Sequence, residues 1–308
     1  MARVVIDRFT VGGAGFAIAR ELGCNLFSWV VDGREVFHRP SGFPERGLPY
    51  AGGNPLLFPA VGRTWDRSVE PPAADAYRLA GHEQPLSMPI HGFLDRCRIG
   101  PPQVDRSAEY VTLIYAAEVP EALVRESYPW PVAVRLELSL TPRRVEIELC
   151  VRNLGGTPVP YAFGAHPYLA ISDPGRDGVS LALPASRSVE LDSELLVPSG
   201  STRALAEPFG LDPEASYDNV FTDLSGTEAV LTDRGAGRRI AVGYDGSITQ
   251  LVIYAPREAP FVCVEPWTAG LDGFSRLADP AWRDAPPLPL LAAGAEARII
   301  MSISVSDC

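Results

Sequence analysis

Two histidines and one glutamate occupy short segments rich in aromatic residues, glycine and proline. His91 stands in Met-Pro-Ile-His-Gly-Phe, His166 in Phe-Gly-Ala-His-Pro-Tyr, and Glu265 in Phe-Val-Cys-Val-Glu-Pro-Trp-Thr. An imidazole titrates near neutral pH, and burial raises the pKa of a carboxylate towards the range where a general base works best. Together these groups could move protons to and from the oxygen atoms of a substrate.

Each of these side chains also has a structural interpretation. A lone histidine is often a satisfied member of the core, and Glu265 could instead accept hydrogen bonds from loop amides. The chain has only four histidines, so two of them in such similar segments favour a function. If residues 261–265 form a strand, Phe261, Cys263 and Glu265 share one face. We then expect Glu265 at the end of that strand, half in contact with water.

Three further residues are candidates for binding hydroxyl groups. Arg63 ends an apolar run rich in glycine and proline at 52–63, and its forked guanidinium can bind two adjacent hydroxyls or a carboxylate. Asp218 is a plausible hydroxyl acceptor, and the indole of Trp267 offers the flat apolar face on which sugar rings stack. The alternatives are an exposed arginine that caps a loop and an aspartate in a turn.

The motifs favour chemistry without a metal or a cofactor. Two histidines and a glutamate could in principle bind zinc, but they lie on three separate segments without a His-x-x-x-His pair. The five cysteines are scattered and contain no Cys-x-x-Cys pair. Nucleophile-elbow, Walker and dinucleotide-binding motifs are absent. We therefore expect no metal and no cofactor.

The elements that must position these residues are β-strands. Polar and apolar residues alternate over 135–140 and 145–152, and the turn between them predicts an antiparallel hairpin with one solvated face. Further strands are predicted at 3–9, 16–22, 25–31, 36–38, 110–116, 179–183, 229–232, 239–244, 249–254, 261–265 and 297–305. Helical signals are few, so we predict an all-β sandwich or barrel. Segments 66–87 and 272–291 are expected to be large surface loops.

The composition of the chain indicates which kinds of partner it could bind and in which compartment it could lie. The 27 cationic residues are all arginine and face 38 acidic residues, a net charge of −11, which argues against nucleic acid or an anionic membrane as partner. No linker or repeat is evident, so one domain over 1–308 is the simplest prediction. No apolar stretch approaches the ~20 residues of a membrane span, and neither a signal-peptide core nor a disulfide framework is apparent. We expect a cytoplasmic protein that acts on a small molecule.

In this order, the motifs resemble those of the aldose 1-epimerase, or galactose mutarotase, family. The resemblance runs from residue 52 to the last strand, over 290–305, and Gly-Ala-His-Pro-Tyr and Glu-Pro-Trp-Thr carry it most specifically. It implies a single-domain antiparallel β-sandwich, the galactose mutarotase-like supersandwich. It also implies that the protein interconverts the α and β anomers of a free aldohexose by opening and reclosing the sugar ring.

The resemblance also implies roles for individual residues. Glu265 matches the general base of the family, His166 its general acid and His91 its second active-site histidine. Arg63 and Asp218 match sugar-binding positions. We picture the carboxylate and the imidazolium on opposite sides of the ring, each contributing ~10²–10⁴-fold to the rate.

The segment after His91 departs from the family's common His-Gly-Phe-x-Arg. Here the arginine comes one residue late, at Arg96, and Asp95 takes its place. In an extended chain Arg96 and Arg98 would face one way and Asp95 the other. Related hexose-6-phosphate 1-epimerases use this region to hold phosphate, so we expect free hexoses to be turned over at least as well as their 6-phosphates. The alternatives are a hexose-6-phosphate 1-epimerase and a non-catalytic carbohydrate-binding protein, and the intact acid–base pair argues against the second.

Overall fold

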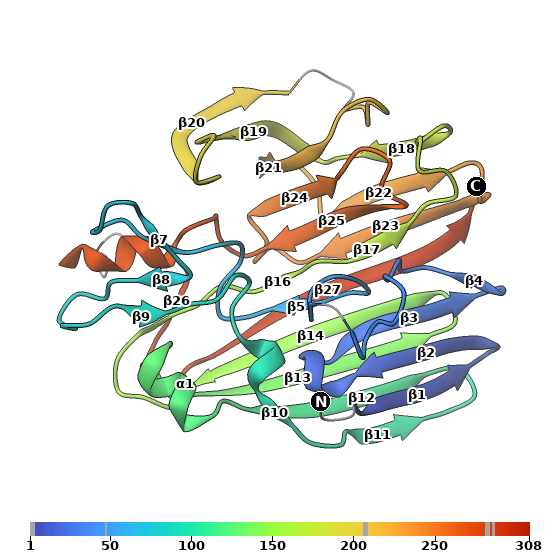
Figure 1. Cartoon of the computed structure of the whole chain (residues 1–308). Coiled ribbons are helices and arrows are strands. Elements are labelled where there is room, and N and C mark those ends of the chain that lie inside the picture. The colour runs from blue at the N-terminus through green and yellow to red at the C-terminus, as the bar shows by residue number, and fades with distance from the viewer. Residues whose placement is uncertain (1–3, 47, 206–208, 281–283, 285–286) are drawn as a thin grey trace.

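Antiparallel sheets account for most of the chain in the computed structural model, which describes residues 4–46, 48–205, 209–280, 284 and 287–308 (Figure 1). The strands of the nine-stranded sheet are β10 (Arg98–Ile99), β11 (Gln103–Arg106), β12 (Val111–Glu118), β13 (Val132–Thr141), β14 (Arg144–Asn153), β18 (Val179–Ala182), β22 (Glu228–Asp233), β23 (Arg238–Tyr244) and β27 (Glu296–Asp307). Their order is β10-β12-β13-β14-β27-β23-β22-β18, with β11 beside β12.

A second large sheet has eight strands. They are β5 (Leu56–Leu57), β16 (Gly164–Ala165), β17 (Tyr168–Ala170), β19 (Ala185–Leu191), β20 (Pro198–Ala204), β21 (Tyr217–Leu224), β24 (Gln250–Ala255) and β25 (Phe261–Trp267). The order is β20-β19-β21-β24-β25-β16-β5, and β17 also pairs with β25. This sheet carries the candidate site.

The remaining elements are smaller. A four-stranded sheet consists of β1 (Ile6–Val11), β2 (Ala14–Ala19), β3 (Asn25–Val31) and β4 (Arg34–Glu35). Two-stranded pairs join β6 (Trp65–Asp66) to β7 (Ala73–Ala74), β8 (Ala76–Tyr77) to β9 (Leu86–Ser87), and β15 (Val159–Pro160) to β26 (Leu290–Leu291). The helices are α1 (Glu121–Glu126), η1 (Arg20–Leu22), η2 (Leu94–Arg96) and η3 (Phe274–Ala278). Among the described residues no helix has the length and apolar character needed to cross a membrane.

The alternating pattern explains the sheets and the core. In β13 the side chains of Leu136, Leu138 and Leu140 are fully buried while their neighbours are partly exposed. The predicted hairpin is confirmed, with Thr141 paired to Arg144 across its turn. One cluster of buried apolar side chains includes residues of both large sheets. The all-β prediction is therefore confirmed.

Some local predictions were wrong. Residues 36–38 do not form a strand. The strand that follows β3 and pairs with it is β4, at residues 34–35, and Phe37 makes only an isolated bridge to Leu169. The described parts of segments 66–87 and 272–291 are not mere surface loops, since β6 and β8 of the first contact η3 of the second. Residues 281–283, 285 and 286 of the second predicted loop lie outside the described residues. The rings of Tyr77 and Phe274 lie 5.2 Å apart. This packing supports the strand β6, which reaches the candidate site.

Candidate active site

The register of the eight-stranded sheet places four polar side chains in one row. Asp218 on β21 pairs with Tyr254 on β24, which pairs with Cys263 on β25, which pairs with Tyr168 on β17. Directly paired residues project to the same face of a sheet. Asp218 therefore belongs to a strand, not to a turn, and its side chain stands on the face that carries the site.

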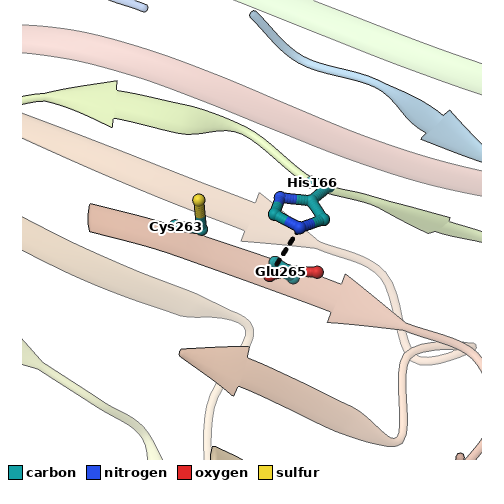
Figure 2. A group of neighbouring side chains, drawn as sticks. All are labelled: His166, Cys263 and Glu265. Atoms are coloured by element: carbon teal, nitrogen blue, oxygen red, sulfur yellow. Dashed lines mark ion pairs between the residues drawn. The ribbon is translucent and has the colours of Figure 1, made fainter. Parts of the chain in front are cut away.

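Glu265 and His166 begin a second row on the same face. Glu265 lies two residues along β25 from Cys263, so both side chains point the same way, as the sequence predicted. The antiparallel register between β17 and β25 pairs Tyr168 with Cys263, and its continuation puts His166 opposite Glu265. The Nε2 atom of His166 lies 3.3 Å from Oε1 of Glu265 (Figure 2). The two groups are thus neighbours and cannot lie on opposite sides of a sugar ring.

The environment of Glu265 differs from the sequence expectation in one respect. Strand β25 does not end at this residue but continues through Pro266 to Trp267. Glu265 is therefore only 1% exposed, not half in contact with water. A buried carboxylate of this kind must be neutral or must face a compensating charge.

Burial shifts the pKa values of the two neighbours in opposite directions. Desolvation raises the pKa of Glu265 well above its usual value, and the nearby charge of Asp218 raises it further. Desolvation lowers the pKa of His166 well below its usual value, and the neighbouring His91 lowers it further. These opposite shifts favour a pair that holds a single proton, and both shifts favour that proton on Glu265. A carboxylate beside an imidazolium, or a carboxyl beside an imidazole, leaves the pair without net charge.

The second histidine is held in a strained backbone conformation. His91 has a φ of 66° and Gly92 a φ of 80°, a region that side chains other than glycine seldom adopt. The N–H of Gly62 donates to Nδ1 of His91 at 3.2 Å, and desolvation, then the charge of Arg63, lowers the pKa of His91 to about 4. The ring is therefore neutral. Because Nδ1 accepts a hydrogen bond, Nε2 must carry the proton.

Gly92 gives this turn a direct test. A Cβ atom there would lie 2.2 Å from the carbonyl oxygen of Phe58 and would also meet the positive φ. We expect Gly92→Ala to lower the free energy of unfolding by more than the ~1–3 kcal/mol of backbone strain alone, and to lower activity by displacing His91. Chemical denaturation measures this effect.

Gly81→Ala is the matched control. Gly81 also has a positive φ, of 88°, but a Cβ there meets nothing within 4 Å. The difference between the two variants isolates the collision with Phe58. Equal losses in both would show that the close approach at Gly92 is unimportant.

Arg63 is oriented by an acidic and an aromatic neighbour. Its Nη1 lies 3.0 Å from Oδ1 of Asp75, and its guanidinium lies 5.9 Å from the ring centre of Trp65. The Trp65 amide in turn donates to Oγ of Ser275 at 2.9 Å and to Oδ1 of Asp272 at 3.2 Å. Arg63 thus presents its remaining donors from a supported loop, not from a free tip.

Trp267 forms part of the wall next to the histidines. Its ring centre lies 6.3 Å from that of His91, and the residue is only 3% exposed. On the other side Gly164 lets the indole approach, since a Cβ there would lie 2.5 Å from Cδ1 of the ring. Most of the indole face is therefore covered. Its Nε1–H lies towards the Glu265 carboxyl group and lowers the pKa of that group, although no hydrogen bond of ordinary geometry joins them. It is a further donor at the site.

One cavity of about 460 Å³ connects the six residues that the sequence predicted to be catalytic or sugar-binding. Its lining includes Arg63, His91, His166, Asp218, Glu265 and Trp267. Sequence reasoning missed the aromatic and apolar part of the wall. That part consists of Tyr50, Trp65, Ile90, Tyr168, Leu191, Leu195, Leu196, Val252, Tyr254 and Leu271. Two of these, Leu195 and Leu196, lie in the connection between β19 and β20, where no strand was predicted.

The charged residues that follow His91 in the sequence lie outside the main cavity. Residues 94–96 form the 3₁₀ helix η2, so the alternation expected for an extended chain does not apply. Asp95 and Arg96 line a neighbouring cavity of about 230 Å³, which shares Tyr50, Ile90 and His91 with the main cavity. Arg98 faces Glu118, with 3.6 Å between Nη1 and Oε1. None of the three charged residues lines the main cavity.

Comparisons with known proteins identify the family and the fold of the chain. A family model described as Aldose 1-epimerase matches residues 11–304. No curated protein matches significantly.

Solved structures share the fold at low sequence identity. A solved structure from Synechocystis sp. PCC 6803 is 20% identical with a TM-score of 0.80, and the match covers 99% of this chain and 97% of that one. A galactose mutarotase-like protein from Clostridium acetobutylicum is 16% identical with a TM-score of 0.78, covering 99% of each chain. A galactose 1-epimerase from Lactobacillus acidophilus NCFM is 13% identical with a TM-score of 0.71, covering 98% and 95%. These likenesses show the galactose mutarotase-like fold.

Proposed function

Because this chain belongs to the aldose 1-epimerase family, we propose that it interconverts the α and β anomers of a free aldohexose. The observation that carries the proposal is the 3.3 Å contact between Nε2 of His166 and Oε1 of Glu265 in the cavity wall. Anomer exchange removes a proton from the C1 hydroxyl and adds one to the ring oxygen. Both oxygens are bonded to C1, so a base and an acid that lie side by side can reach them together.

The single proton of the pair is sufficient for a complete cycle. The pKa shifts favour the proton on Glu265, so the reaction starts when that proton passes to Nε2 of His166 across the 3.3 Å contact. Glu265 then accepts the C1 hydroxyl proton while His166 donates its proton to the ring oxygen. The bond between C1 and the ring oxygen breaks, and an open-chain aldehyde forms. After rotation about C1–C2, the hydroxyl attacks the other face of C1, His166 takes back its proton and Glu265 returns a proton to the carbonyl oxygen.

Neighbouring residues supply complementary hydrogen-bonding groups. Nε2–H of the neutral His91, the guanidinium of Arg63 and the indole N–H of Trp267 are donors, whereas the Asp218 carboxylate is an acceptor. Such a set suits a ring that carries a hydroxyl on nearly every carbon. We assign these residues to binding and orienting the sugar, and the proton transfers to Glu265 and His166.

The charges of the cavity favour a free sugar over a phosphorylated one. Arg63 is the only lysine or arginine among the described residues that line it, against the carboxyl groups of Glu194, Asp218 and Glu265. A phosphate carries nearly two negative charges and binds tightly where several donors converge. Arg63 is already paired with Asp75.

We therefore expect free hexoses to be turned over at least as well as hexose 6-phosphates. One missing charge-assisted contact is worth about 1.5–3 kcal/mol, or roughly 10–150-fold in preference. Polarimetry or saturation-transfer NMR gives kcat/KM for glucose, galactose and glucose 6-phosphate side by side. A clear preference for the phosphate would favour the hexose-6-phosphate 1-epimerase alternative. Sugar binding without any exchange would favour a binding protein.

A further inference from the structure

Cys263 brings a third metal-ligating group to the acid–base pair. One ligand atom each from His166, Cys263 and Glu265 lies within 4.8 Å of the others, and all three residues are buried. Figure 2 shows Cys263 and Glu265 on one strand, with the ring of His166 next to them. The sequence analysis considered only two histidines and a glutamate on separate segments as zinc ligands, and it predicted no metal.

We propose that His166, Cys263 and Glu265 form a binding site for Zn²⁺, and that the bound ion switches off the anomer exchange proposed above. The switch, but not the binding site, rests on that proposed function. Nothing in the spacing of sequence motifs indicates the site, because it depends on the pairing of β17 with β25.

The geometry fits a three-coordinate protein site. Residues two apart on a strand project to the same face, which aligns Cys263 with Glu265, and the register adds His166 from the other side. Zinc takes thiolate sulfur at about 2.3 Å and imidazole nitrogen or carboxylate oxygen at about 2.0–2.2 Å. The ligand atoms around one tetrahedral ion are thus roughly 3.3–3.8 Å apart. Small side-chain rotations would close the present 4.8 Å spacing.

The donor set also selects the kind of ion. A thiolate prefers soft or borderline ions such as zinc to Mg²⁺ and Ca²⁺, which favour oxygen ligands. Oε2 of Glu265 has no hydrogen bond of ordinary geometry among the described residues, although the side chain is 1% exposed and the indole N–H of Trp267 lies near enough to lower the pKa of the carboxyl group. A buried acceptor without a partner is costly, and a bound cation would remove that cost. Three protein ligands would leave the fourth position for water.

Occupancy of this site would stop the proposed reaction. The ion would share the lone pairs of Glu265 that accept the substrate proton. It would also replace the proton on Nε2 of His166, the nitrogen that faces Glu265. Neither group could then exchange a proton with the sugar.

Two measurements on the whole protein test the site. Equilibrium dialysis of metal-free protein against Zn²⁺ should give one tight site, and Co²⁺ in its place should give a thiolate-to-metal charge-transfer band. Exchange should fall in proportion to zinc occupancy, whereas Mg²⁺ and Ca²⁺ should leave it unchanged. Cys263→Ser and Cys263→Ala should lose the cobalt band, bind zinc at least roughly 10-fold more weakly and keep anomer exchange.

Cys97→Ser is the matched control, because Cys97 is also a buried free thiol but is outside the cluster. It should respond to zinc like the unmodified protein. Absence of a tight zinc site, a cobalt spectrum without the thiolate band, or zinc that raises the exchange rate would overturn the inference. Metal binding is read without activity, so failure of the site and failure of the proposed epimerase function can be told apart.

Discussion

Glu265→Gln is expected to abolish catalysed anomer exchange while the protein stays folded. The amide keeps the size of the carboxyl group and fills the same position, where the side chain is 1% exposed, but it cannot accept a proton at neutral pH. Loss of a positioned general base alone costs ~10²–10⁴-fold, and here the same group must also return the proton. Polarimetry with freshly dissolved α-glucose or α-galactose measures the effect.

The direction in which Glu265→Gln changes the stability of the protein can also be predicted. Burial raises the pKa of Glu265 in the folded protein, so folding favours the protonated form, and ionisation costs stability as the pH rises above the pKa of the unfolded chain. A neutral amide removes this penalty. Near neutral pH the Glu265→Gln protein should therefore be no less stable than the unmodified protein in thermal denaturation.

Glu194→Gln is the control for the charge of the cavity. Glu194 also lines the cavity but is exposed and lies between β19 and β20. We expect this variant to retain most of the exchange rate. A Glu265→Gln protein with near-normal turnover would mean that Glu265 is structural and that the proposed mechanism is wrong.

A strand could be predicted from the sequence where one of its faces is buried and the other is exposed. The hairpin of β13 and β14 has a buried and a half-exposed face, so its alternation is visible in the sequence. Strand β20 is exposed at nearly every position and carries no such signal. Two-residue strands such as β5 and β16 are too short for any periodicity, and their position depends on partners far away in the chain.

In the candidate site, too, some features could be predicted from the sequence and others could not. The motifs identified six residues that line one cavity, because glycine, proline and aromatic residues mark unusual local structure. They could not show that His166 faces Glu265, since that contact depends on the register between β17 and β25. They also underestimated the burial of Glu265, because Pro266 suggested a strand end whereas it pairs with Leu251 inside the ladder.

His166→Asn should cause the other large loss of activity. Removal of the general acid is expected to lower the rate by ~10²–10⁴-fold, with far smaller effects from asparagine at His38 or His82. His82 is exposed, and His38 stacks on Phe261 at 5.2 Å without lining the cavity. Similar losses in all three variants would indicate that the histidines act through stability.

The pH dependence separates an acid from a merely packed ring. The His166 ring also stacks on Tyr168 at 4.6 Å, so the asparagine variant will lose some stability whatever the mechanism. Burial lowers the pKa of His166 and raises that of Glu265, and the active pair holds one proton.

Exchange by the unmodified protein should therefore fall both at low pH, where a second proton binds, and at high pH, where the last proton leaves. Without the imidazole of the pair, Glu265 is the remaining proton-transfer group, so the residual catalysed rate should rise with pH through its raised pKa and should not fall again. A variant that keeps both limbs of the profile would show that His166 is not the acid.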